Sequence, residues 1–268
     1  MIRAIRVLFP NSSIRQVVKN GDQKMSKSEN IGDIYHSETK YYRDRMSGGR
    51  MQFPDISIFY KTYPNAEIIE LPELNLPQGE SIWDVIQRRR SIRQYSQDAI
   101  SVDDLAILLW AIQGITAQRG NYSFRTSPSA SALYPIETYI MAKRVENVDQ
   151  GIYHYDVYKH RLEVVKKGDF GIELTNAALD QDMIDNSALT FIWTAVLPRS
   201  KWKYRERAYR YIYMDAGHIC QNAYLAVEAL GMGCCSIGAF FDDEVNSVIG
   251  IDGKSEISVY LCTIGKKR

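Results

Sequence analysis

A stretch of nine residues, RRRSIRQYS, holds four arginines and two serines in a chain whose net charge is only +1. Its first three arginines, residues 88–90, end a helical pattern, where cations stabilise the helix dipole by about 0.3–1 kcal/mol each. The residues beyond them, SIRQY, read as extended chain, in which alternate side chains share a side. The expected sides are Ser91, Arg93 and Tyr95 on one, and Ile92 and Gln94 on the other.

Two interpretations of this cluster follow from the residue types. Guanidinium groups beside a hydroxyl form a donor set that binds phosphate through charge-assisted, partly bidentate hydrogen bonds. Arg89 or Arg90 would complete that set from the end of the helix. The alternative is a helix cap that binds no ligand.

A glycine-rich run, GMGCCSIG at residues 231–238, raises the question of a dinucleotide site. The dinucleotide fingerprint needs its glycines between a strand and a helix. This run instead follows a long helical pattern, which disfavours a dinucleotide site. On residue types alone, the SIGAF residues at its end read as a loop that turns on glycine.

The cysteines and histidines give no metal or redox motif. Four cysteines lie in apolar surroundings without the paired C-x-x-C spacing of a zinc site or a redox dithiol: Cys220, Cys234, Cys235 and Cys262. An adjacent pair such as Cys234–Cys235 would form a strained disulfide, so we interpret it as packing. The four histidines are scattered, and we predict no metal site. Reduced core cysteines favour a cytoplasmic protein.

Composition limits the class of protein. The 268 residues are 45% hydrophobic and 24% charged, which fits one large globular domain, alone or with an extension. The 33 basic and 32 acidic residues leave no overall field that would attract nucleic acid or anionic lipid. A run of about 18 apolar residues and a secretory signal are both missing from the sequence. We expect a soluble, cytoplasmic protein that binds neither nucleic acid nor membrane.

Two parts are expected along the chain, an N-terminal arm at residues 1–80 and a globular domain at residues 81–268. Glycine and four prolines interrupt every pattern between residues 46 and 79, which indicates an irregular arm over the surface. The character of the sequence changes at Met25, and the codons for the preceding GDQK can contain a ribosome-binding sequence. The hypothesis is that Met25 is the native start and that residues 1–24 are not native.

Three helices are predicted. The first begins at SIWDVIQRRR, where Ser81 and Asp84 form a start similar to a capping box. The second has Ser101 as its N-cap and Gly114 as its end. The third covers about six turns, or about 30 Å, and ends at Gly231. It is densely apolar, with Gly217 permitting close approach of another helix, so we expect a central or interface helix.

Five segments rich in β-branched and aromatic residues are predicted as strands: residues 137–144, 151–158, 161–168, 188–196 and 257–265. The strands do not alternate regularly with helices. This order favours an α+β domain over a doubly wound parallel sheet.

Three segments, taken in order, carry a resemblance to a known family: RRSIRQY (89–95), PSASALYPIETY (128–139) and YRYIYMDAGHICQNAYLAVEALGMGCCSIGAF (209–240). They resemble the nitroreductase family of FMN-dependent oxidoreductases, and the similarity runs from about residue 81 to 265. PSASALYP and DAGHICQN are similar to the SagB-type dehydrogenases, which oxidise azoline rings to thiazoles and oxazoles in ribosomally made peptides. YHSETKYY (35–42) resembles the opening segment of that subgroup.

The resemblance implies a nitroreductase-like α+β fold, with a central, mainly antiparallel sheet flanked by helices and a long interface helix. It also implies a homodimer with two FMN sites, each built from both chains. The FMN phosphate and ribityl chain would contact Arg89, Ser91 and Arg93, with Arg90 a further candidate.

The resemblance assigns the remaining cofactor contacts as well. Residues beside the flavin ring, from the partner subunit, would be Ser129, Ala130, Ser131 and Leu133. Backbone groups near the flavin N5 and O4 edge would belong to Ile237, Gly238 and Ala239. Ala132 stands where general nitroreductases often carry asparagine, so one contact to the flavin edge is lost. Lys266 and Arg268, near the C-terminus, are further candidates for the phosphate.

Lys203 and Tyr204 fall at the place of a lysine–tyrosine pair that is associated with catalysis in the azoline oxidases. Azoline oxidation removes two hydrogens, so a base must take a proton from carbon while a hydride goes to the flavin, which dioxygen then reoxidises. A lysine partly desolvated beside Arg205 and Arg207 would have a lowered pKa and could act as the base, with tyrosine relaying or orienting the proton. The alternative is a solvated charged loop.

Three functions stay open at this point. The first is an FMN-dependent oxidase of azoline heterocycles that works beside a cyclodehydratase on a precursor peptide. The second is a general nitro- or quinone-reductase that takes electrons from NAD(P)H. The third is a non-enzymatic scaffold subunit of a peptide-modifying complex.

Overall fold

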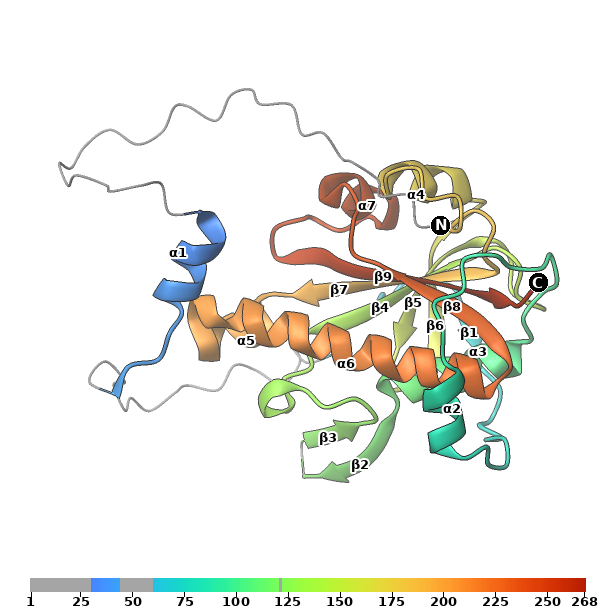
Figure 1. The fold of residues 1–268 in the computed structure, drawn as a ribbon, viewed down its shortest axis with the longest axis horizontal. Helices are drawn as coiled ribbons and strands as arrows, with labels where there is room; N and C mark the ends of the chain where they lie inside the picture. The colour runs from blue at the N-terminus through green and yellow to red at the C-terminus, as the bar shows by residue number, and fades with distance from the viewer. Residues whose placement is uncertain (1–29, 44–59, 121) are drawn as a thin grey trace. The chain divides into compact units, whose positions relative to one another are not determined.

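The computed structural model describes residues 30–43, 60–120 and 122–268 (Figure 1). The chain divides into two compact units, Met1–Asp44 and Arg45–Arg268. The described part of the first unit contains helix α1 (Ile31–Glu38). The hypothesis of a native start at Met25 concerns residues outside the described ranges.

A seven-stranded sheet forms the centre of the second unit, in the order β1-β6-β5-β4-β7-β9-β8. Every neighbouring pair is antiparallel. The strands are β1 (Ile68–Glu70), β4 (Ile136–Ala142), β5 (Gly151–Asp156), β6 (Arg161–Lys167), β7 (Leu189–Val196), β8 (Met232–Ile237) and β9 (Glu256–Lys266). The predicted α+β fold is confirmed, and the five predicted strands are β4, β5, β6, β7 and β9.

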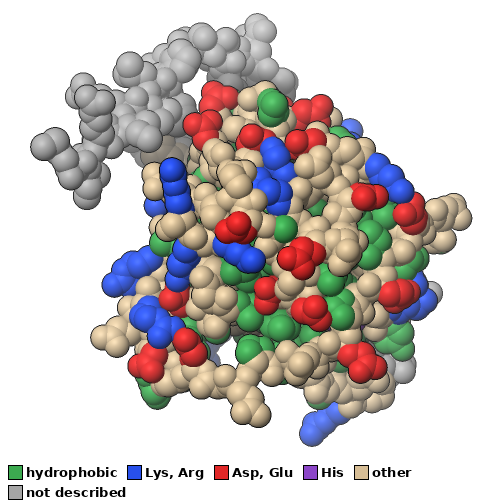
Figure 2. Space-filling model, turned by 90° about the vertical axis from the view of Figure 1, so that its right-hand side faces the viewer, with side chains coloured by type: hydrophobic (Ala, Val, Ile, Leu, Met, Phe, Trp, Pro, Cys, Tyr) green, Lys and Arg blue, Asp and Glu red, His purple; other side chains and the backbone are tan. Residues whose placement is uncertain are grey.

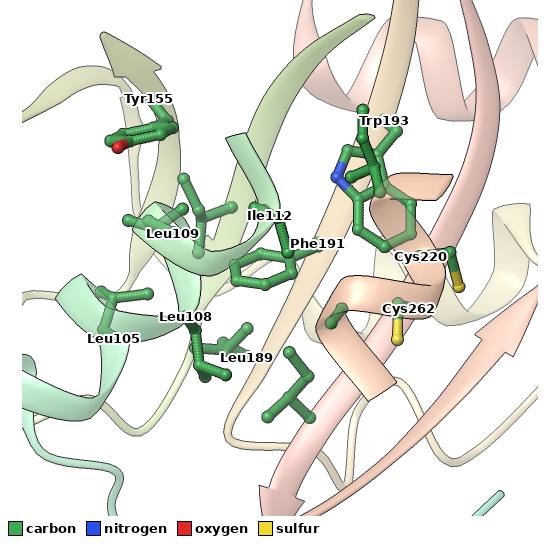
Figure 3. Packing of buried hydrophobic residues seen from close by; sticks show 14 of the residues in the cluster. Leu105, Leu108, Leu109, Ile112, Tyr155, Leu189, Phe191, Trp193, Cys220 and Cys262 are labelled. Carbon is green, nitrogen blue, oxygen red and sulfur yellow. The ribbon is translucent and has the colours of Figure 1, made fainter. Parts of the chain in front are cut away.

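Both faces of the sheet are covered, which explains why its central strands are apolar on both sides. On one face lie α3 (Val102–Gln113) and α6 (Ala208–Ala229), and on the other lie α4 (Gly171–Ala177) and α7 (Asp242–Ile249) (Figure 1). Leu108 and Ile112 of α3 share a core cluster with Phe191 and Trp193 of β7, and Figure 3 shows Ile112 beside the Phe191 ring. Ile192, between those two, belongs to the core under α4 and α7.

Helix α6 is the long helix that the sequence predicts. Its 22 residues extend about 33 Å, and the chain turns at Gly231 with a φ of +71°. Ile212, Ala216 and Ile219 are buried against the sheet, which confirms a central position. Gly217 faces away from the core, where an added Cβ would find no atom of the described chain within 4 Å.

The other two predicted helices also form, as α2 (Ile82–Arg88) and α3. The Ser81 hydroxyl accepts a hydrogen bond from the amide of Trp83, and the Ser101 hydroxyl accepts one from the amide of Asp104. The apolar face predicted for α2 is only partly buried. Val85 is buried, whereas Ile82 and Ile86 stay about half exposed.

Several short elements were not predicted. They are β1, β8, the hairpin of β2 (Ile115–Arg119) and β3 (Tyr122–Arg125), and the helices α4, α5 (Pro198–Tyr204) and α7. Strand β1 lies within the segment expected as an irregular arm, and it pairs with β6 at the sheet edge. Strand β8 begins one residue into the glycine-rich run and pairs with β9.

Charges of both signs are interspersed over the face that Figure 2 presents, in keeping with a net charge of +1. Across the described ranges, no helix combines the length and hydropathy that crossing a bilayer requires. Within the same ranges, no three His, Cys, Asp or Glu residues gather into a group that could hold a metal. All four cysteines are buried and free.

Candidate functional site

The arginine segment (residues 89–95) leaves α2 and runs along the free edge of β8. Ser91 pairs with Cys234 in a parallel bridge, and the Ile92 amide donates to the Cys234 carbonyl over 2.9 Å. Ile92 packs onto Gly233, where an added Cβ would lie only 2.8 Å from the isoleucine Cβ. Glycine therefore gives the arginine segment room to lie against the strand.

Tyr95 does not share a side with Ser91 and Arg93, so that expectation is wrong. Its side chain is 5% exposed, and its hydroxyl donates to the Ile92 carbonyl over 2.7 Å. The ring lies on Gly265, which pairs directly with Gly233. The segment makes isolated bridges at residues 91 and 95 rather than a continuous ladder, so strict alternation of side chains does not apply.

The four arginines of the cluster divide by their partners. Arg88 forms ion pairs with Glu80 and Glu228. The Arg90 guanidinium folds back and donates to the carbonyls of Gln87 and Arg89, at 3.0 and 2.8 Å. These two side chains match the helix-cap interpretation.

The other two arginines, Arg89 and Arg93, lie beside Tyr224 and Cys235. Arg89 lies over the Tyr224 ring, 5.1 Å from its centroid. Arg93 is exposed beside Cys235, where burial raises the pKa of the thiol and the arginine charge opposes that rise. In the described part of the chain, neither arginine forms an ion pair with a carboxylate.

Tyr224 of α6 joins the arginine segment to the end of β8, and sequence reasoning missed it. Its hydroxyl lies 3.1 Å from Ser91 Oγ and accepts from the Ser236 amide over 3.0 Å. Ser236 directly precedes the predicted flavin-edge residues. Of those, Ile237 is buried, while Gly238 and Ala239 are exposed. A tyrosine beside the apolar stripe of the long helix was the available signal.

The serine turn (residues 129–134) has an unusual backbone. Ser131, Ala132 and Tyr134 have φ values of 57°, 52° and 44°, in the left-handed region that costs energy for residues other than glycine. Leu133 is buried and Ser131 is exposed. Such a turn persists only where its surroundings hold it.

Asp215 of α6 holds the beginning of this turn. Its carboxylate accepts from Ser129 Oγ at 2.6 Å and from the Ala130 amide at 3.3 Å. Ser129 Oγ in turn accepts from the Tyr134 amide at 2.9 Å. Burial raises the pKa of Asp215, and these two donors oppose the rise. Sequence reasoning missed Asp215, although a carboxylate next to buried apolar positions of a helix was a usable signal.

Lys203 and Tyr204 lie on helix α5, not in a loop, and both reach Ser131. The Lys203 Nζ donates to Ser131 Oγ over 2.7 Å, and Tyr204 Oη lies 2.5 Å from the same oxygen. The Tyr204 ring packs against Tyr211 with centroids 4.5 Å apart. Amine, alcohol and phenol thus form a continuous line of hydrogen-bonding groups, along which a proton can move.

Nine of the predicted site residues form two groups. The lysine group is Ser131, Lys203 and Tyr204, which lie near the N-terminal end of α6. The arginine group is Arg89, Ser91, Arg93, Ile237, Gly238 and Ala239.

Helix α6 separates the two groups within one chain. Their anchors, Asp215 and Tyr224, are nine positions apart, which is about 13 Å along the axis and about half a turn around it. Helix α5 lies at one end of α6, and α2 lies beside the other end (Figure 1). The C-terminal residues run beside the arginine segment, because the Ser96 amide donates to the Lys266 carbonyl at 2.9 Å. Arg268 is exposed at the end of the chain.

Comparison with known proteins identifies the family. Residues 86–266 match the model of the nitroreductase family. The chain is 36% identical over 197 residues to MJ1384 of Methanocaldococcus jannaschii, described as a nitroreductase, covering 73% of this chain and 96% of that protein. It is 30% identical over 138 residues to the trifolitoxin-processing protein TfxB of Rhizobium leguminosarum bv. trifolii, covering 50% of this chain and 37% of TfxB.

A solved structure agrees with this assignment. A crystal structure described as a nitroreductase, from Anabaena variabilis, superimposes with a TM-score of 0.72 at 29% identity. The match covers 88% of this chain and 47% of that one, so this chain spans about half of its length. Fold, matched segment and sequence identity agree, and the chain therefore belongs to the nitroreductase family of oxidoreductases.

Proposed function

We propose that the protein is an FMN-dependent, SagB-type dehydrogenase that oxidises azoline heterocycles in a modified peptide, beside a cyclodehydratase. The observation that carries this proposal is the meeting of Lys203, Tyr204 and Ser131. The resemblance assigns the first two to catalysis and the third to the flavin, and the three side chains lie within hydrogen-bonding distance. The 30% identity to TfxB, named for the processing of trifolitoxin, supports a peptide substrate.

The arginine group fits the phosphate of FMN. Arg89 and Arg93 bring two cations to one edge of β8, and the Ser91 hydroxyl lies between them in the sequence. Guanidinium groups without a carboxylate partner are suited to a phosphate. Arg90 donates to two backbone carbonyls, so we propose that it contributes less to phosphate binding than Arg89 and Arg93. Lys266 and Arg268 are further candidates for the phosphate.

A second copy of the chain is part of the proposal. Because α6 separates the two groups, a ligand held by the arginine group of one chain would meet the lysine group of its partner. The outward side of α6 carries Tyr213 and Met214, each more than half exposed, beside the open Gly217. On α2, Trp83 is 75% exposed. Exposed apolar side chains of this kind support a homodimer interface.

Bound FMN would supply the acceptor for the hydride that the substrate loses. Lys203, in its neutral form, takes the proton from the substrate carbon as a general base. Ser131 Oγ lies between Lys203 Nζ and Tyr204 Oη, so it can pass this proton toward the phenol or hold the amine in place. Packing against Tyr211 fixes the direction of the phenol.

The test compares Lys203→Ala and Tyr204→Phe with wild type in FMN content and azoline turnover. Removing a general base lowers turnover by about 10²–10⁴-fold, so we expect that loss for Lys203→Ala with the flavin retained. The matched control is Lys201→Ala, because Lys201 lies on the same helix but pairs with Glu206 and packs on Tyr209. Full turnover by Lys203→Ala with bound flavin would remove the catalytic assignment.

A second candidate function is a reductase that takes electrons from NAD(P)H. The identity to MJ1384, described as a nitroreductase, favours it. Rapid bleaching of the flavin by NAD(P)H without oxygen would support the reductase, whereas slow or absent bleaching would favour the azoline oxidase. A colourless protein that binds no added FMN would instead support a scaffold subunit.

A further inference from the structure

Three buried ionisable side chains, one from each of three neighbouring strands, form a row behind the serine turn. They are Glu137 on β4, His154 on β5 and Glu163 on β6, and each is at most 3% exposed. His154 Nε2 lies 3.0 Å from Glu137, and Nδ1 lies 3.0 Å from Glu163. Because both ring nitrogens face a carboxylate, both carry a proton, and the ring is positively charged.

The surrounding charges keep this row ionised. Burial lowers the pKa of His154, but the hydrogen bonds to Glu137 and Glu163 outweigh it and raise the pKa overall. Burial raises the pKa of Glu137, but Arg199 and then His154 outweigh it and hold the pKa at about 2. Arg125 also faces Glu137, and Arg161 faces Glu163. The row is therefore a chain of alternating charges.

Arg199 of α5 continues this row of charges beyond Glu137 and links the row to the serine turn. Its Nη1 lies 2.5 Å from Glu137 Oε1 and donates to the Tyr134 carbonyl over 3.2 Å. Arg199 and Lys203 are four positions apart, so they share one face of α5. The helix is thus joined to the turn at two points one helical turn apart, Arg199 to Tyr134 and Lys203 to Ser131.

The turn needs both ends held. A left-handed residue other than glycine costs on the order of 1–3 kcal/mol, and the turn contains three. Asp215 holds its beginning, through Ser129 and Ala130. Arg199 holds its end through the Tyr134 carbonyl, and only 1% of Arg199 is exposed, so it is too buried to touch a substrate.

We propose that Arg199, braced by Glu137, His154 and Glu163, is a positioning residue that sets Lys203 and Tyr204 against Ser131. The inference rests on the proposed function, since that function makes Lys203 and Tyr204 the reacting groups. Arg199 acts on the reaction through them.

The kinetic test compares two variants in which Arg199 is replaced. Arg199→Lys keeps the charge, and Arg199→Met combined with Glu137→Gln removes both charges, so that neither partner is left buried without the other. A displacement of about 1 Å can cost about 10²-fold in rate. We therefore expect kcat of the double variant to fall by about that factor, with KM and FMN affinity unchanged, and Arg199→Lys to recover most of it.

The matched control for stability is Leu105→Ala. Leu105 is fully buried in α3, so its loss destabilises the core by about 2–5 kcal/mol without touching α5. We expect folded Leu105→Ala to keep its kcat. An equal loss of kcat in the control and the double variant, or no loss in the double variant, would overturn the proposal.

A second measurement needs neither flavin nor turnover. Amide hydrogen exchange of residues 198–204 and 129–134 reports whether α5 and the serine turn loosen together. We expect faster exchange in both segments of the double variant than in Leu105→Ala, and wild-type protection in both would overturn the proposal. If Lys203→Ala retains turnover, the proposed function fails by itself, and hydrogen exchange alone then decides whether Arg199 positions α5.

Discussion

A single hydroxyl group, that of Tyr224, connects the two segments of the proposed FMN site. It bonds to Ser91 Oγ and to the Ser236 amide. Tyr224→Phe removes this link and leaves the ring under Arg89 in place. A hydrogen bond contributes about 0.5–1.5 kcal/mol, so we expect FMN affinity to fall by roughly 2–13-fold for one such bond, measured by flavin fluorescence titration.

The control for this change is Tyr155→Phe, which removes another buried hydroxyl, bonded to His160 Nδ1 at 2.7 Å. Its FMN affinity should equal that of wild type. If both variants lose affinity equally, the effect is a general loss of stability, and the special role of the Tyr224 hydroxyl is contradicted.

The shifted pKa values of Glu137 and His154 predict how the stability of the fold depends on pH. Its pKa is about 2 when folded against a usual 4.5, so the ionised group stabilises the fold above pH 4.5 and loses this effect as pH falls toward 2. The raised pKa of His154 has the opposite sign: its stabilisation is complete below about pH 6.5 and is lost as pH rises through the folded value. The two windows overlap between about pH 4.5 and 6.5, where the row is most stabilising.

Glu137→Gln tests this dependence. Removing one partner from a buried ion pair costs about 3–5 kcal/mol, so we expect a loss of this order in the free energy of unfolding at pH 6. The difference from wild type should shrink toward pH 3, because wild-type Glu137 then begins to lose its advantage. Urea unfolding at both pH values measures it, and a difference that is the same at both would contradict the assignment.

The arginine cluster illustrates what residue types can and cannot predict. The helix-cap interpretation describes Arg88 and Arg90, whereas the phosphate site at Arg89 and Arg93 stays a prediction. Arg88 is engaged by Glu228, which only the fold brings near, whereas Arg90 donates to the carbonyls of its sequence neighbours Gln87 and Arg89. Arg199 was overlooked for the same reason, since its partner Glu137 lies far away in the sequence.

At the scale of elements, the strands that the sequence predicts are those whose two faces are both covered by helices. The five predicted strands have long β-branched and aromatic runs because helices cover both sides of the sheet. Strand β1 has three residues and depends on its pairing with β6, which leaves no local pattern. The glycine-rich run raises the question of a dinucleotide site and not of a strand, whereas its Gly233 lies within β8 and leaves room for Ile92 to pack on it.

Gly233→Ala tests this packing. The added Cβ would lie 2.8 Å from Ile92, so the arginine segment must move away from β8 and carry Ser91 and Arg93 with it. Overpacking costs about 1–3 kcal/mol, and we expect a loss of this size in thermal unfolding, together with weaker FMN binding. Gly79→Ala is the control, because its added Cβ meets no described atom within 4 Å. Unchanged FMN affinity in Gly233→Ala would contradict the expectation that the packing of Ile92 on Gly233 positions Ser91 and Arg93 for FMN.

At the scale of the whole molecule, the position of α6 decides how many chains a site needs. The lysine group and the arginine group lie at different ends and on different sides of this helix, so under the proposed function one chain would present two separate half-sites. Two-fold symmetry would bring each half-site opposite the complementary half of the partner. A dimer would then contain two equivalent sites, each dependent on both chains.

Mixing two inactive variants tests this arrangement. One chain carries Arg89→Ala and Arg93→Ala, the other carries Lys203→Ala, and each homodimer alone should be inactive. In a statistical mixture half of the dimers are heterodimers, and each has one site with both groups intact, so about a quarter of wild-type turnover should return. A site built within one chain would regain nothing, because every chain in the mixture has a damaged half. Turnover of the mixture, with mass measurement to confirm heterodimers, therefore distinguishes a shared site from a site within one chain.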